Sequence, residues 1–149
     1  MLQPGQMVRF SIQTALLLLV ALFALTKGGR PERHVAIILC GMFLANLAHA
    51  GIFGRWTDYG TTPWFRIVLD TTGFALILAV ALRADRWWPL WVSGVQLLAV
   101  LAHLLRVIDA SLPPLVYAVM ERWPFWIAIA ITGIGSLLYH RRLRIGSPS

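Results

Sequence analysis

The sequence is poor in charge and almost free of cysteine, and both shortages narrow the kind of protein that it encodes. Only 13% of the 149 residues are charged, whereas soluble domains have about 25%, so an ordinary water-soluble globule is excluded. The single cysteine, Cys40, rules out an intramolecular disulfide framework and any CxxC redox or zinc motif. The sequence also lacks a GxSxG elbow, a glycine-rich phosphate loop and an HExxH helix, so phosphate, ester and peptide chemistry have no support in it.

Apolar residues dominate instead, at 58% of the chain, with a mean hydropathy of +0.73. A helix that crosses a bilayer needs roughly 20 such residues. Runs bounded by charge, glycine and proline therefore predict one all-α transmembrane domain over residues 1–149, a bundle of five helices at about 8–27, 34–53, 64–82, 88–108 and 124–140. Residues 114–122 are too short to cross and predict a separate interfacial helix, with Pro124 in the first turn of the fifth span.

The basic residues predict the orientation of these spans. The net charge of +7 is spread between apolar segments, which argues against nucleic-acid binding and favours a topological role. One side of the predicted bundle holds eight of the Lys and Arg residues: Lys27, Arg30, Arg33, Arg83, Arg86, Arg141, Arg142 and Arg144. The other five lie on the opposite side, so we expect the N-terminus outside and the C-terminus in the cytoplasm. The tryptophans fall at both predicted boundaries, as an aromatic belt does.

A short internal similarity suggests that the chain contains a duplication. The hexapeptides 44–49 and 98–103 agree at five of six positions and lie in spans that run in the same direction. This pattern predicts a two-helix unit, formed by spans 2–3 and again by spans 4–5, used twice in parallel. Because Leu and Ala are abundant in any apolar run, a coincidence is the competing explanation.

Three ionisable residues lie inside the predicted spans at a similar depth. His49, Asp70 and His103 each fall about 10 Å below the outer boundary, by the rise of a helix. An ionisable group in lipid costs about 2.5–3.5 kcal/mol, so we expect all three to face the bundle. Small residues at Gly41 and Ala45 continue a stripe to His49 that would allow close helix packing. Further polar residues complete the predicted cluster: Gln13, Asn46, Gln96, Arg66 and Arg106.

Several chemistries are compatible with that cluster. His49 and His103 could be the axial ligands of a b-type haem, with Arg66 and Arg106 at its propionates. Alternatively, His49, Asp70 and His103 could bind a divalent metal or a quinone headgroup, or relay protons. The simplest interpretation is structural, with Asp70 paired to Arg66 and the histidines hydrogen-bonded to Asn46, Gln96 or backbone carbonyls.

The stretch 85–91, DRWWPLW, followed by Gly94, Gln96 and His103, resembles a pattern in small bacterial multi-spanning membrane proteins to which no activity is assigned. The resemblance implies a multi-pass protein of the bacterial inner membrane and no mechanism. We therefore expect a non-enzymatic component that acts in the lipid bilayer by helix packing, as a homo-oligomer or within a larger membrane complex. The alternative is an electron-transfer or lipophilic-ligand protein that uses the His/Asp cluster with a haem, quinone or metal.

Overall fold

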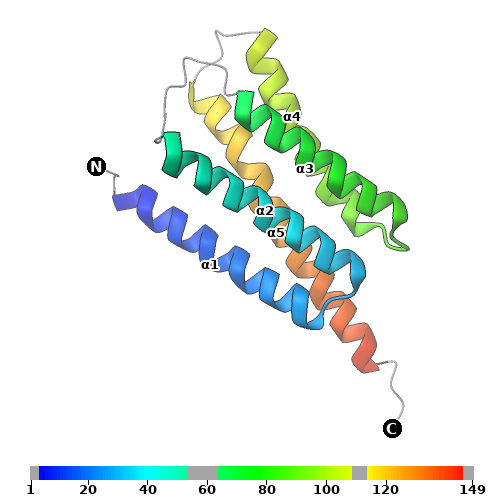
Figure 1. Ribbon diagram of the computed structural model, residues 1–149. Coiled ribbons are helices and arrows are strands. Elements are labelled where there is room, and N and C mark those ends of the chain that lie inside the picture. The colour runs from blue at the N-terminus through cyan, green and yellow to red at the C-terminus, as the bar shows by residue number, and fades with distance from the viewer. Residues whose placement is uncertain (1–3, 54–63, 109–113, 146–149) are drawn as a thin grey trace.

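A computed structural model describes residues 4–53, 64–108 and 114–145, and this part of the chain is helical without strands (Figure 1). Long apolar runs form the helices, and glycine, proline and charge separate them. The first connection shows this clearly: the Gly28 N–H bonds to the Ala24 carbonyl at 2.9 Å and closes the first helix. The helices are α1 (Pro4–Lys27), α2 (Arg30–Phe53), α3 (Trp64–Arg83), α4 (Trp88–Ile108) and α5 (Pro114–Ile145).

The helices run alternately up and down and form a closed ring. Each packs against its neighbour in the sequence, and α5 closes the ring by contacting α1 and also α2. α3 packs against both α2 and α4. The core of the bundle contains Leu17, Val35, Leu39, Ile77, Val92 and Ile129, each at most 2% exposed. Alternation places the end of α1, the start of α2 and the end of α5 at one end of the bundle, which we call the basic end.

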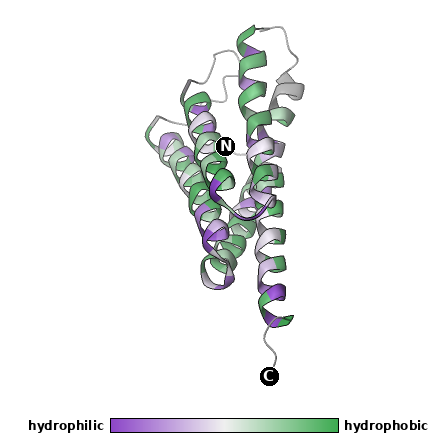
Figure 2. Cartoon of the chain, turned by 90° about the vertical axis from the view of Figure 1, so that its right-hand side faces the viewer, coloured by the Kyte–Doolittle hydropathy of each residue, from purple (hydrophilic) through white to green (hydrophobic). Residues whose placement is uncertain are grey.

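All five helices are long and apolar enough to cross a membrane, as the sequence predicts, and the chain is a multi-pass membrane protein. Many large apolar side chains face outward, among them Leu18, Leu22 and Leu98, each more than half exposed. Such surfaces are stable in lipid and would aggregate in water. Figure 2 shows hydrophobic residues along the helices and hydrophilic residues gathered near the C-terminal end of α5.

The fifth helix corrects the prediction of a separate interfacial helix. Residues 114–122 belong to α5, which is one continuous helix of 32 residues with Pro124 inside it. Proline in a helix removes one hydrogen bond and crowds the carbonyl four residues earlier. That carbonyl belongs to Met120, which precedes the span-competent segment, so water can satisfy it. Pro124 therefore lies within the helix and does not begin it. The span-competent part of α5 is Arg122–Ile145.

The helices pack closely at Gly73 and Gly135 and not at Gly41, where the sequence predicts it. A Cβ at Gly73 would collide with the Met42 side chain, and one at Gly135 would lie 2.8 Å from the Trp88 ring. Gly41, in contrast, is exposed and has open space around it. The expected close approach along the Gly41 stripe is therefore wrong within the described part of the chain, because α2 turns Val35, Leu39 and Met42 inward instead.

Candidate functional site

A buried polar cluster joins α3 to α4 in the half of the bundle away from the basic end. The Asp70 carboxylate accepts a hydrogen bond from Gln96 Nε2 at 3.1 Å through Oδ1. Its Oδ2 lies 2.8 Å from His103 Nε2. The His103 side chain is 0% exposed and that of Asp70 is 19% exposed. We call Asp70, Gln96 and His103 the α3–α4 polar cluster.

Helical spacing explains why these three side chains meet. Asp70 lies on the stripe of α3 that continues through the buried residues Gly73, Ile77 and Ala81. Gln96 and His103 lie on the buried stripe of α4, two turns apart on one face. The carboxylate enters between them, so that each oxygen has its own hydrogen-bond partner. Asp70 is therefore bonded to α4, and its pairing with Arg66 stays a prediction.

His49 reaches α3 at a different place. Its ring stacks on Phe65, with 4.0 Å between centroids and 13° between planes. Phe65 and Asp70 are five positions apart, which is about 140° around the helix, so His49 and His103 contact different faces of α3. In the described part of the chain no group of three His, Cys, Asp or Glu side chains is placed to hold a metal ion. The predicted metal set of His49, Asp70 and His103 is not assembled.

The arrangement does not fit a haem between the two histidines either. Two axial ligands must face one iron, whereas His49 and His103 contact different faces of α3. His103 Nε2 is also engaged by Asp70 at 2.8 Å. Arg66 and Arg106, which the haem hypothesis assigns to propionates, are both half-buried at the same end of the bundle. Of the remaining predicted polar residues, Gln13 is half-buried and Asn46 is exposed.

The α3–α4 polar cluster can perform two kinds of chemistry. First, it can hold α3 and α4 together, because polar side chains in the membrane interior have no water to bond to and form hydrogen bonds between helices instead. Second, it can form hydrogen bonds with a ligand. The Asp70 side chain is 19% exposed, and Gln96 Oε1 is buried and has no hydrogen-bond partner among the described residues. One proton lies between Asp70 and His103, whichever of the two carries it.

A second polar network, which sequence reasoning missed, lies at the basic end. Glu32 is 0% exposed and its Oε1 lies 3.0 Å from Arg86 Nη1. The Arg86 guanidinium also lies over the Tyr139 ring, 4.3 Å from its centroid. These contacts link α2, the α3–α4 connection and α5. In the sequence Glu32 stands between Arg30 and Arg33 and resembles an ordinary solvated loop residue. The only local sign of its burial is the adjacent Gly28–Gly29 pair. In the structure a Cβ at Gly29 would lie 2.9 Å from Glu32 Oε2.

Comparison with known proteins adds nothing to this geometry. No protein-family model matches the chain, and no curated protein and no solved structure matches it.

Proposed function

We propose that the chain is a non-enzymatic component of the bacterial inner membrane that acts by packing its helices against a second copy of itself. The observation that carries the proposal is the outward face of α2. Gly41 and Ala48 are exposed on it and Ala45 is half-exposed, and the nearest described atoms leave open space around Gly41. These three residues, which we call the α2 small face, lie within about 60° around the helix.

Small residues at this spacing allow two transmembrane backbones to approach closely, which strengthens their van der Waals contact. The buried faces of the bundle use the same device at Gly73 and Gly135, where Met42 and Trp88 fill the space. On the α2 small face no described residue of the chain fills it. Ile37, Leu44 and Ile52 flank it and are all more than half exposed, so they would form the rim of an interface with a partner helix.

The buried polar groups support a structural role for the same reason. Both oxygens of Asp70 are bonded to α4, and Glu32 is bonded to Arg86. Side chains that are committed to one another hold helices together, and they are less available to a substrate. A single chain would in this account be a rigid unit, and the assembly would be the functional form.

The test compares two leucine substitutions that are matched within the chain. Gly41→Leu fills the α2 small face, whereas Gly94→Leu places the same side chain on α4, where the glycine is also exposed and surrounded by open space. At neither position would an added Cβ come within 4 Å of the described chain. We expect the wild type and Gly94→Leu to be dimers in mild detergent, by light scattering with the detergent mass subtracted, and Gly41→Leu to be a monomer. Dimers of equal strength in all three would contradict the proposal, and a larger hetero-complex from native membranes would assign the face to another partner.

The membrane orientation of the chain is part of the same proposal. The basic end is proposed to face the cytoplasm and the N-terminus the outside, supported by the excess of Lys and Arg at that end. The duplication stays a prediction. Its two matching histidines have different surroundings, because His103 is 1% exposed and His49 is half-buried beside Phe65.

A second candidate function is binding of a lipophilic ligand with a hydrogen-bonding headgroup, such as a quinone, beside Asp70. The observation that favours it is the partial exposure of this carboxylate, 19%, next to a fully buried His103. Titration of the purified chain with a short-chain quinone, followed by tryptophan fluorescence, tests it. Binding that is lost in Asp70→Asn and retained in His49→Ala would support this candidate. Equal quenching in both variants would contradict it.

A further inference from the structure

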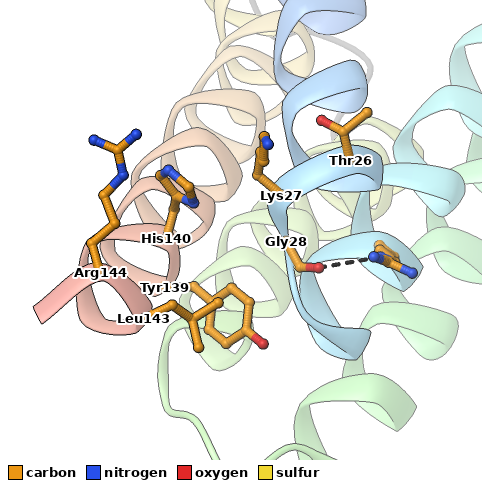
Figure 3. Close-up of a pocket in the computed structure, with 8 residues that line it drawn as sticks. Thr26, Lys27, Gly28, Tyr139, His140, Leu143 and Arg144 are labelled. Carbon is orange, nitrogen blue, oxygen red and sulfur yellow. Dashed lines mark hydrogen bonds between the residues drawn. The ribbon is translucent and has the colours of Figure 1, made fainter. Parts of the chain in front are cut away.

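A shallow cavity of about 410 Å³, open to the outside, lies at the basic end between the end of α1, the start of α2 and the last turns of α5 (Figure 3). Its size is in the range of sites that hold small ligands, about 300–1,000 Å³. Three of its lining residues are cationic at neutral pH: Lys27, Arg33 and Arg144. No acidic side chain is among the described residues that line it: Thr26, Lys27, Gly28, Arg33, Tyr139, His140, Leu143 and Arg144.

Several contacts hold the cavity walls in place. Arg33 Nε donates to the Gly28 carbonyl at 3.2 Å, so the two Nη groups are the part of the guanidinium that can meet an anion. The His140 ring packs edge-on against Phe23, with 5.9 Å between centroids, and this contact joins α5 to α1 beside the cavity. The Thr26 hydroxyl donates to the Leu22 carbonyl at 2.7 Å. Recognition is therefore left to the cationic side chains.

The position of the cavity along the helices indicates the source of the anion. The spans of α1 and α5 end at Lys27 and Ile145, and that of α2 begins at Arg30. The cavity thus lies where hydrocarbon gives way to lipid headgroups. Leu143 in its wall is 54% exposed, and Leu22, one turn inward from Thr26 on α1, is 62% exposed. An anion with apolar tails would meet the cations and Leu143 at the cavity and Leu22 on its membrane side.

We propose that this cavity binds the phosphate headgroup of an anionic phospholipid. Lys27, Arg33 and Arg144 surround the phosphodiester, and the acyl chains lie on the leucines of α1 and α5. Basic pockets between transmembrane helices on the cytoplasmic side recognise such headgroups by charge and hydrogen bonding. A zwitterionic lipid carries its own cation and gains less from the site, and inorganic phosphate lacks the apolar contacts.

The experiment counts lipids bound to the delipidated full chain in neutral detergent by native mass spectrometry. The probes are phosphatidylglycerol, phosphatidylcholine and inorganic phosphate. The site variant carries Lys27→Gln, Arg33→Gln and Arg144→Gln. The control carries Arg30→Gln, Arg83→Gln and Arg142→Gln, which remove the same charge from exposed positions at the same end, outside the cavity.

Each basic residue near an anionic lipid contributes about fivefold in affinity. We expect the site variant to lose at least about tenfold in affinity for phosphatidylglycerol, and the control to stay within about twofold. Equal losses in the two triple variants, or equal affinity of the wild type for phosphatidylcholine, would overturn the proposal. Phosphate that binds as tightly as the lipid would overturn the lipid assignment. Should the triple variant fail to fold, Lys27→Gln alone, at an exposed residue, is expected to lose about threefold to fivefold, and no loss in it overturns the proposal.

Discussion

Asp70 and His103 meet across the α3–α4 interface with 2.8 Å between Oδ2 and Nε2. At the other end of the bundle Glu32 and Arg86 make a 3.0 Å ion pair. The two contacts lie near opposite ends of the spans and join different elements. Together they fix how α2, α3 and α4 are rotated, which apolar packing alone specifies weakly.

The first prediction concerns His103. His103→Ala removes one of the two hydrogen-bond partners of Asp70 and leaves it with Gln96 alone, so the free energy of unfolding should fall by about 1–2 kcal/mol, the upper range for hydrogen bonds between transmembrane helices. Unfolding in a mixed micelle with increasing SDS measures this. His49→Ala, which removes the ring stacked on Phe65 and lies outside the α3–α4 polar cluster, should cost less. A larger loss of unfolding free energy in His49→Ala than in His103→Ala would show that the α3–α4 polar cluster is not the main polar contact that stabilises the bundle.

The second prediction concerns the buried carboxylate of Glu32. Arg86→Ala leaves this carboxylate without its cation, and we expect a loss of about 3 kcal/mol, the lower end for a broken buried pair, because Arg86 is itself 27% exposed. Adding Glu32→Gln should restore part of the loss. The exposed Arg83→Ala should change stability by less than about 0.5 kcal/mol. Additive effects in the double variant would mean that the pair does not couple.

The third prediction uses glycine packing. Gly135→Ala forces a methyl group against the rigid Trp88 ring at 2.8 Å, and overpacking of this kind costs about 1–3 kcal/mol. Gly94→Ala meets nothing within 4 Å and should be neutral or stabilising by up to about 1 kcal/mol, because alanine favours the helix. Thermal unfolding in detergent, measured side by side, distinguishes them. A stable Gly135→Ala would place α4 and α5 farther apart than described.

The fourth prediction concerns orientation. A green fluorescent protein fused after Ile145 should fluoresce, because it folds in the cytoplasm, and alkaline phosphatase fused after Ile108 should be active, because it folds outside. The reverse pattern would invert the proposed topology and would place the lipid site in the outer leaflet.

The sequence predicts the number and the limits of the helices well, because length and hydropathy determine what crosses a bilayer. α4 begins at Trp88 and ends at Ile108 as expected. The prediction fails at Pro124, which suggests a helix start. α5 begins ten residues earlier, at Pro114, and continues through Pro124, so a proline near the edge of a span does not mark where the helix begins.

The rotation of α2 could not be predicted for a different reason. Its residues are apolar on nearly every side, so the sequence carries little information on which face is buried. The depth of Asp70 and His103 was estimated from the rise of a helix, and the structure brings these two residues together with Gln96. Depth does not specify direction around the helix, however, and His49 contacts Phe65 instead. The burial of Glu32 depends on contacts with residues far away in the sequence, Arg86 and Tyr139, which no local pattern encodes.

The most direct test of self-association is disulfide cross-linking along α2 in intact membranes. In a Cys40→Ala background, which removes the one native cysteine, cysteine is introduced at Gly41 or Ala48 on the α2 small face, or at Gly94 on α4 as the control. We predict that mild oxidation yields a covalent dimer from at least one of the α2 positions and none from Gly94. Cross-linking from Gly94 alone, or equal cross-linking at all three positions, would contradict the account.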